Sequence, residues 1–166
     1  MITLFLGGAR SGKSTAAERL AAGLPAPVTY VATAQIDPGD GDLAQRIAIH
    51  RGCRPPSWST VEAGADLPGA MAGVPGTALV DSLGSWVAAH RDFAIDLDGL
   101  LTTLSGRSAD TIIVSDEVGL GVHPETELGR RYRDVLGAVN QAVAEIADSV
   151  FLVVAGRCLP LERVPE

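Results

Sequence analysis

The sequence predicts an α/β fold in which helices cover both faces of a mostly parallel sheet, and two observations carry this prediction. Short apolar runs bounded by turn or polar residues occupy residues 2–6, 28–32, 78–81, 111–115 and 149–154, as expected of buried strands. Helical patterns lie between these runs, the clearest over residues 125–147, where apolar side chains recur every three or four positions. Strands that are apolar throughout are typical of a parallel sheet covered on both faces, and such a sheet binds its ligand at the carboxyl ends of its strands.

Length and composition favour one domain that spans residues 1–166, because 46% of the 166 residues are hydrophobic and can form a core. Residues 64–77 are rich in Gly, Ala and Pro and should hold a short helix between loops. The formal net charge of −7 argues against nucleic-acid binding, which needs a basic surface. Cys53 and Cys158 form no disulfide or zinc motif, so we expect a reducing, cytoplasmic setting. No apolar stretch is long enough for membrane insertion.

The first apolar run leads into a glycine-rich loop with the pattern G-x-x-x-x-G-K-[ST], followed by a predicted helix over residues 14–22. Strand, loop and helix in this order are typical of a P-loop NTPase, where backbone N–H groups at the helix amino terminus bind phosphate oxygens. Lys13 should reach the β- and γ-phosphates, and the Ser14 hydroxyl should complete a Mg²⁺ shell. A glycine turn that merely caps a helix is the alternative. The predicted nucleotide-binding residues of the loop are Gly7, Gly8, Ala9, Arg10, Ser11, Gly12, Lys13 and Ser14.

Carboxylates follow two of the predicted strands. A phosphate loop needs an acidic residue at the end of a neighbouring strand to orient Mg²⁺, and Asp81 is the best candidate because it closes the run at 78–81. Asp116 and Glu117, which follow the run at 111–115, are the second candidate. Either position also suits a helix cap with no catalytic role. The strand-then-Asp context favours a metal role for Asp81, whereas the two readings of Asp116 and Glu117 are balanced.

A histidine segment is the second informative region. Residues 43–50 form a helical pattern that must end before the proline pair at 55–56, which places His50 near a helix end. Three arginines surround it in the sequence: Arg46, Arg51 and Arg54. The cluster would bind phosphate, and a neutral imidazole beside it could attack phosphorus as a nucleophile. A surface histidine without function is an equally good reading of these residues alone.

Five motifs in chain order resemble the bifunctional adenosylcobinamide kinase/adenosylcobinamide-phosphate guanylyltransferase family of cobalamin biosynthesis. The resemblance covers nearly the whole chain, and its specific part is the histidine segment with its Trp and Glu, followed by the Ser-x-Glu-Val-Gly segment. The motifs are GGARSGKS at 7–14, YVATA at 30–34, RIxxHRxxRPxxWxTxE at 46–62, VSDEVGxG at 114–121 and RYRDxxGxxNQ at 131–141.

The resemblance implies two reactions. A nucleoside triphosphate, ATP or GTP, would phosphorylate adenosylcobinamide with the help of Lys13. In the second reaction His50 would take GMP from GTP, and adenosylcobinamide phosphate would then accept the GMP to give adenosyl-GDP-cobinamide. The resemblance implies that residues 32–34 and Glu62 contact GTP. The full set of predicted nucleotide-binding residues, besides the loop, is Ala32, Thr33, Ala34, Arg51, Gly52, Cys53, Arg54, Glu62 and Asp81.

Several implied details depend on single residues. Glu62 could accept N1–H and the exocyclic amine of guanine, or it could be an exposed charge at a strand end. Arg131, Arg133 and Asn140 are more simply solvated helix residues than phosphate ligands. Asp116 stands where the family usually has Asn. Family members assemble as rings, which implies a homo-oligomer. A different small-molecule P-loop kinase, or a nucleotide-gated binding module without turnover, are the alternative functions.

Overall fold

The computed structural model describes residues 1–34 and 54–163. The predicted helix over residues 43–50 lies outside them. In chain order, the elements are β1 (Ile2–Gly7), α1 (Lys13–Ala22), β2 (Val28–Ala32), β3 (Ser59–Glu62), α3 (Leu67–Ala72), β4 (Thr77–Asp81), α4 (Leu83–Ala88), the 3₁₀ turn η1 (Arg91–Phe93), α5 (Leu97–Gly106), β5 (Thr111–Asp116), α6 (Glu127–Ile146), β6 (Ser149–Val154) and β7 (Arg157–Leu161).

The strands form one seven-stranded sheet in the order β3-β2-β4-β5-β1-β6-β7. Neighbouring strands of the described residues are parallel except β6 and β7, which pair antiparallel. The five strands expected from apolar runs are all present, so the predicted mostly parallel sheet is confirmed. The two strands that the apolar pattern missed, β3 and β7, are the edges of the sheet, and most of their residues are exposed.

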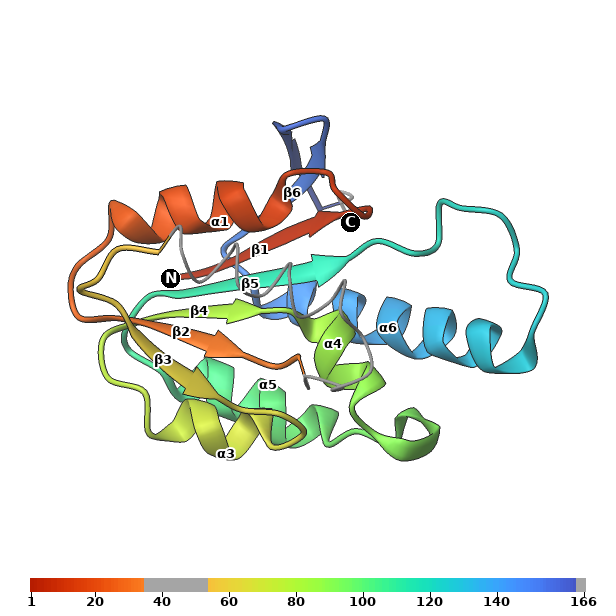
Figure 1. Cartoon of the computed structure of the whole chain (residues 1–166), viewed down its shortest axis with the longest axis horizontal. Coiled ribbons are helices and arrows are strands. Elements are labelled where there is room, and N and C mark those ends of the chain that lie inside the picture. The colour runs from red at the N-terminus through yellow and green to blue at the C-terminus, as the bar shows by residue number, and fades with distance from the viewer. Residues whose placement is uncertain (35–53, 164–166) are drawn as a thin grey trace.

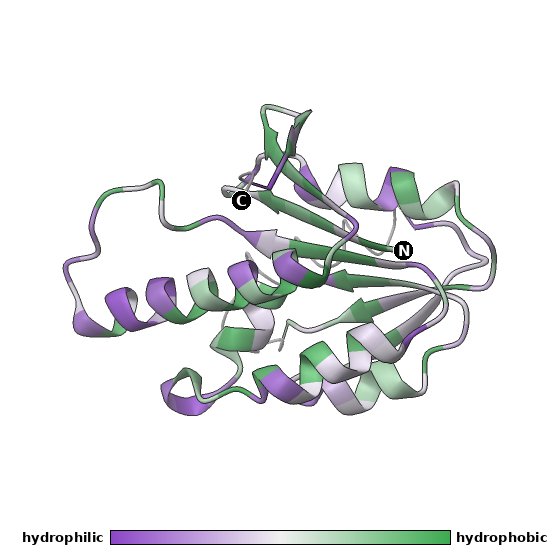
Figure 2. Cartoon of the chain, turned by 180° about the vertical axis from the view of Figure 1, so that it is seen from behind, coloured by the Kyte–Doolittle hydropathy of each residue, from purple (hydrophilic) through white to green (hydrophobic). Residues whose placement is uncertain are grey.

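Helices cover both faces of the sheet, as predicted, but unequally. Helix α1 lies on one face, and α3, α4, α5 and α6 lie on the other (Figure 1). The strands serve both layers because successive side chains point to opposite faces. In β1, for example, Leu4 joins the core under the four helices, whereas Phe5 joins the core under α1. Figure 2 shows this pattern as hydrophobic strands between helices that are hydrophobic on one side.

Helix α6 matches the predicted 125–147 segment within two residues at its start and one at its end. The Thr126 side chain caps it by accepting a hydrogen bond from the Gly129 N–H at 3.1 Å. From its middle to its carboxyl end it buries Leu136, Val139, Asn140 and Val143, so the expectation that Asn140 is solvated was wrong. Its amino end extends away from the sheet (Figure 1), and it is hydrophilic there (Figure 2). The short helix expected within residues 64–77 is α3. None of the helices in the described ranges is both long and apolar enough to cross a membrane.

Candidate nucleotide-binding site

The loop between β1 and α1 needs glycine at two positions. A Cβ at Gly7 would lie 2.5 Å from the Ser11 Oγ and 2.7 Å from the Val153 carbonyl oxygen, so a side chain there would push the loop off the sheet. Gly12 has φ +93°, a left-handed conformation that side chains rarely adopt. These two glycines let the chain turn tightly at the carboxyl end of β1 and enter α1.

Helix α1 begins without a side-chain cap, and this sets it apart from the other α-helices of the described residues. Its N-cap is Gly12, and its first turn holds no acidic residue. The other α-helices, by contrast, are capped by side chains that accept a backbone N–H: Asp66 for α3, Ser82 for α4, Asp96 for α5 and Thr126 for α6. An uncapped amino terminus leaves backbone N–H groups and the positive end of the helix dipole available for an anion.

A cavity of about 450 Å³ lies over this uncapped end. The Ser11 Oγ is buried there with no hydrogen-bond partner in the described part of the chain, as expected of a group that binds a ligand. Backbone donors, hydroxyls and one lysine around a concave space are suited to phosphate groups. The lining residues are Ala9, Arg10, Ser11, Gly12, Lys13, Ser14, Thr15 and Asp116.

Lys13 faces Asp116 across the cavity. The Lys13 Nζ lies 2.7 Å from the Asp116 Oδ1 and donates to the Gly8 carbonyl oxygen at 3.2 Å. Parallel pairing aligns Gly7 with Asp116, which brings the end of β5 beside the loop. Asn140 on α6 supports this strand end, because its Nδ2 donates to the Asp116 carbonyl oxygen at 3.1 Å. A nucleotide that recruits Lys13 must therefore draw it away from a carboxylate.

Asp81 occupies a different place from Asp116. It ends β4, which is separated from β1 by β5, and it is not among the residues that line the cavity. Its Oδ2 accepts a hydrogen bond from the Tyr30 hydroxyl at 2.8 Å. Of the two candidate carboxylates, Asp116 is thus the one in contact with the loop lysine.

The residues that the family resemblance assigns to the ends of β2 and β3 lie side by side at one edge of the sheet. Ala32 is aligned with Glu62 on one side and with Asp81 on the other. Thr33, which follows Ala32, is fully buried. Its Oγ1 donates to the Ser82 carbonyl oxygen at 2.6 Å and accepts from the Ser82 N–H at 2.9 Å. The strand ends of β3, β2 and β4 are therefore held side by side, with Ala34 the last residue described before the gap.

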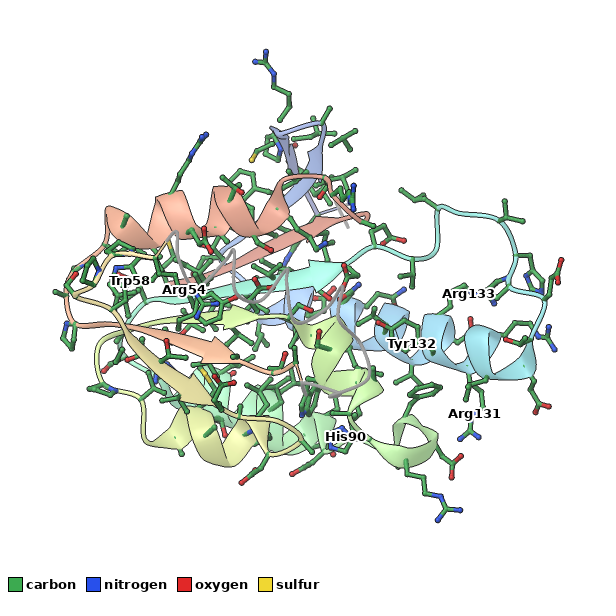
Figure 3. The ribbon with its side chains drawn as sticks, viewed as in Figure 1. Arg54, Trp58, His90, Arg131, Tyr132 and Arg133 are labelled. Carbon is green, nitrogen blue, oxygen red and sulfur yellow. The ribbon has the colours of Figure 1, made fainter. Side chains whose placement is uncertain are left out.

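Arg54, which is labelled in Figure 3, lies over Tyr30, a member of the core cluster under α1. Its guanidinium carbon is 3.2 Å from the centroid of the Tyr30 ring. The Nε and Nη1 atoms of Arg54 are buried and have no hydrogen-bond partner in the described ranges. The remaining members of the predicted histidine cluster, namely Arg46, His50, Arg51, Gly52 and Cys53, lie outside the described residues.

The remaining candidates have partners within the protein. The Arg131 guanidinium donates to the Asp92 carbonyl oxygen at 3.0 Å, and Arg133 pairs with Asp134 at 2.7 Å on the exposed end of α6 (Figure 3). The Glu117 carboxylate accepts the Gly119 N–H at 2.6 Å and so shapes the loop after β5.

Two tyrosines beside the acidic residues, Tyr30, which is buried, and Tyr132, which is half-buried, have raised pKa values. Burial, and after it the Asp81 charge, raises the pKa of Tyr30 far above its ordinary value. Burial and then the Asp116 charge raise the pKa of Tyr132 to about 12. Both hydroxyls are therefore donors at neutral pH. Sequence reasoning missed Tyr30, because an aromatic residue within a strand is typical of an ordinary core position.

Comparison with known proteins gives a consistent picture. The chain matches the family described as cobinamide kinase / cobinamide phosphate guanyltransferase over residues 3–161. It is 44% identical to the bifunctional adenosylcobalamin biosynthesis protein CobP of Pseudomonas aeruginosa, with 99% of each chain covered. It is 37% identical to the protein CobU of Salmonella typhimurium, with 94% of this chain and 97% of that one covered. Among solved structures, the flagellar accessory protein FlaH of Methanocaldococcus jannaschii shares the fold, with a TM-score of 0.50 and 16% identity over 95% of this chain and 74% of that one.

Proposed function

The chain belongs to the cobinamide kinase / cobinamide phosphate guanyltransferase family, and from this membership we propose that it phosphorylates adenosylcobinamide and then transfers GMP to the product through His50. The observation that carries the proposal is a phosphate cavity at an uncapped helix, in a chain that matches this family from residue 3 to residue 161. We also propose that residues 1–166 act as one catalytic domain, since all described strands join a single sheet.

In the kinase reaction, the hydroxyl oxygen of the aminopropanol arm bonds to the γ-phosphorus as the bond to the bridging oxygen breaks. The uncapped N–H groups of α1 and the Lys13 ammonium offset the charge on the transferring group. Lys13 exchanges its contact with Asp116 for the phosphates, so Asp116 holds the lysine until nucleotide arrives. The loop binds phosphates and contacts no base, and so it accommodates ATP or GTP.

We propose Mg²⁺ as the metal ion of this site. Within the described residues, no three His, Cys, Asp or Glu side chains form a metal-binding group. Mg²⁺ suits such a site because it keeps several waters and binds through substrate phosphates and one or two protein oxygens. We propose that Ser14 supplies one of these oxygens and that Asp81, which does not line the cavity, orients the ion through water. When bound, Mg²⁺ would neutralise charge on the phosphates.

In the guanylyl transfer, an imidazole nitrogen of His50 bonds to the α-phosphorus of GTP, and pyrophosphate leaves. A phosphate oxygen of adenosylcobinamide phosphate then displaces the histidine. Splitting the transfer into two displacements avoids a direct encounter of two polyanions. Arg54 supports this assignment, because its Nε and Nη1 have no hydrogen-bond partner among the described residues. We assign Arg51, Gly52 and Cys53 to the same nucleotide, and Glu62 to its guanine, since Glu62 is aligned with Ala32.

Association with further copies of the chain is part of the proposal. Large apolar side chains are exposed on the loop before α6, where Leu120 is 80% and Val122 95% exposed, and on the β6–β7 hairpin, where Val154 is 60% exposed. Apolar side chains gathered on protruding segments favour a protein interface. A net charge of −7 disfavours nucleic acid as the partner. Sedimentation of a monomer at micromolar concentration would refute a homo-oligomer.

Labelling with GTP that carries ³²P at the α-phosphate tests the function. The chain has three histidines, so His90→Ala and His123→Ala are matched controls for His50→Ala. We expect label that survives alkali and leaves in acid on the unsubstituted protein and on both controls, and none on the His50→Ala protein. The His50→Ala protein should keep its kinase activity. No label on any protein, with nucleotide bound and adenosylcobinamide phosphorylated, would favour a simple kinase. Binding with neither label nor phosphorylation would favour a binding module.

A further inference from the structure

We propose that Tyr30 is a positioning residue that sets two charged groups of the site: its hydroxyl orients the Asp81 carboxylate, and its ring holds the Arg54 guanidinium. The inference rests on the proposed function, which gives Asp81 to Mg²⁺ and Arg54 to a nucleotide phosphate. Tyr30 itself touches neither the metal nor the nucleotide in this scheme. It acts through the two groups that it places.

The hydroxyl contact follows from strand register. Tyr30 on β2 is aligned with Leu79 on β4, and Asp81 lies two residues further along the same face. A diagonal neighbour of this kind is within reach of a long aromatic side chain. The Tyr30 hydroxyl donates to the Asp81 Oδ2 at 2.8 Å from a side chain that is only 4% exposed. This hydrogen bond fixes the rotation of the Asp81 carboxylate.

The ring contact orients the guanidinium. With its carbon 3.2 Å from the ring centroid, Arg54 presents one face to the ring of Tyr30. A guanidinium stacked by its face keeps its N–H groups directed sideways, where they remain free to donate. Two nitrogens of Arg54, Nε and Nη1, have no hydrogen-bond partner in the described part of the chain, and their N–H groups point to different sides of the guanidinium. Charged N–H donors without a protein partner are suited to phosphate oxygens.

A core role alone does not account for Tyr30. Leu79, Val28 and Val114 build the same face of the sheet without polar atoms, and an aliphatic side chain would fill that space. The polar end of Tyr30 and the partnerless donors of Arg54 are the features that packing leaves unexplained. Both are explained by a residue that aims a carboxylate and a guanidinium at a bound nucleotide.

The test compares Tyr30→Phe, which keeps the ring, with Tyr30→Leu, which loses the ring and the hydroxyl. Phe151→Leu is the matched control, because it removes a ring from the same core cluster without contact to Asp81 or Arg54. GTP affinity is measured by calorimetry in EDTA and across a Mg²⁺ titration, and thermal unfolding confirms that each protein is folded. The α-phosphate labelling rate is measured at saturating Mg²⁺.

For Tyr30→Phe we expect a rise of about five-fold in the Mg²⁺ concentration that gives half of the increase in GTP affinity. A change of this size corresponds to the loss of one hydrogen bond. Its GTP affinity in EDTA and its labelling rate at saturating Mg²⁺ should be unchanged. For Tyr30→Leu, GTP affinity in EDTA should also fall, by about ten-fold, as the guanidinium loses its platform. Phe151→Leu should change neither quantity.

Arg54→Lys tests the ring contact with Tyr30 intact, since lysine keeps the charge but has no planar group to stack. We expect the same loss of about ten-fold in EDTA. An unchanged Mg²⁺ dependence in Tyr30→Phe would overturn the role of the hydroxyl, and an unchanged GTP affinity in Arg54→Lys would overturn the role of the ring. If the unsubstituted protein binds GTP and is labelled, either of these results would contradict this inference and leave the proposed function intact. Absence of both binding and label in that protein would overturn the proposed function and this inference with it.

Discussion

Arg107 and Arg54 both place a guanidinium group beside the sheet, and they differ in their hydrogen-bond partners. Arg107 stands at the amino end of β5, where its Nε donates to the Thr111 Oγ1 at 3.0 Å. Its other nitrogens donate to the carbonyl oxygens of Met71, Val74 and Gly76. Arg54 has a ring beneath it, and its Nε and Nη1 have no partner in the described part of the chain. Buried donors are normally satisfied, so the difference separates an arginine that joins chain segments from one that is ready for a ligand.

The same contrast divides the two ends of the sheet. At the amino ends of β4 and β5, Arg107 joins the loop before β4 to the first residue of β5. At the carboxyl ends, α1 is uncapped and the Ser11 hydroxyl is unpartnered among the described residues. One end uses its polar groups for stability, and the other keeps them available for binding. Substitutions at each end should therefore change different measurements.

The largest effect is expected for Lys13→Ala at the binding end. Loss of the ammonium removes charge stabilisation of the transferring phosphoryl group, and we expect both activities to fall by at least about 10³. The free energy of unfolding should fall by no more than about 1 kcal/mol, because a partly exposed ion pair with Asp116 contributes little. Phosphorylation and labelling assays measure the two activities, and chemical denaturation measures the free energy of unfolding. A large loss of stability would erase the proposed distinction between the ends.

Arg107→Ala should show the reverse pattern. It leaves the Val74 and Gly76 carbonyl groups without their donor, and we expect the free energy of unfolding to fall by about 3 kcal/mol. GTP affinity, measured where the protein remains folded, should be unchanged. Arg130→Ala is the matched control, since Arg130 also donates to two carbonyl groups but in a more exposed position, and it should cost less than about 1 kcal/mol. Equal losses in the two variants would contradict a special role for Arg107.

Asp116→Asn should sharpen the description of the binding end. The change releases Lys13 and removes a negative charge beside the phosphate cavity, so GTP affinity in EDTA should rise by about three- to ten-fold at low salt. GTP titrations at two salt concentrations measure this affinity, and the increase in affinity should be smaller at the higher salt concentration. Asp134→Asn, which breaks an exposed pair with Arg133, is the control and should leave affinity unchanged. A weaker affinity in EDTA would mean that Asp116 assists binding by itself.

The smallest effect is expected for Tyr132→Phe, which removes the hydrogen bond from the Tyr132 hydroxyl to the Gly84 carbonyl oxygen. At neutral pH the loss should be about 0.5–1 kcal/mol. The folded pKa of about 12 lies above the ordinary value of 10.0, so the stabilisation from Tyr132 is complete below pH 10 and is lost as the pH rises toward 12. Denaturation at pH 8, 10 and 11 should show the variant losing less stability with pH than the unsubstituted protein. Parallel pH curves would exclude this linkage.

Local sequence patterns were enough for much of the fold. The five predicted strands and helix α6 appear because apolar runs and three- and four-residue spacing report burial directly. The edge strands β3 and β7 carry too few buried residues to leave such a pattern. The phosphate loop could also be predicted from the sequence, because the residues of its backbone turn and its lysine are contiguous in the chain.

The sequence by itself determined the phosphate loop, the order of buried strands and the acidic character of the chain, because each depends on neighbouring residues or on composition. Tertiary structure alone decided which carboxylate meets Lys13: Asp81 and Asp116 both end strands, and only the position of β5 beside β1 brings Asp116 to the loop. It also decided the environment of Tyr30, whose partners Asp81 and Arg54 are 51 and 24 positions away in the chain. Strand register and helix packing create such neighbours, and neither is recorded in a local pattern.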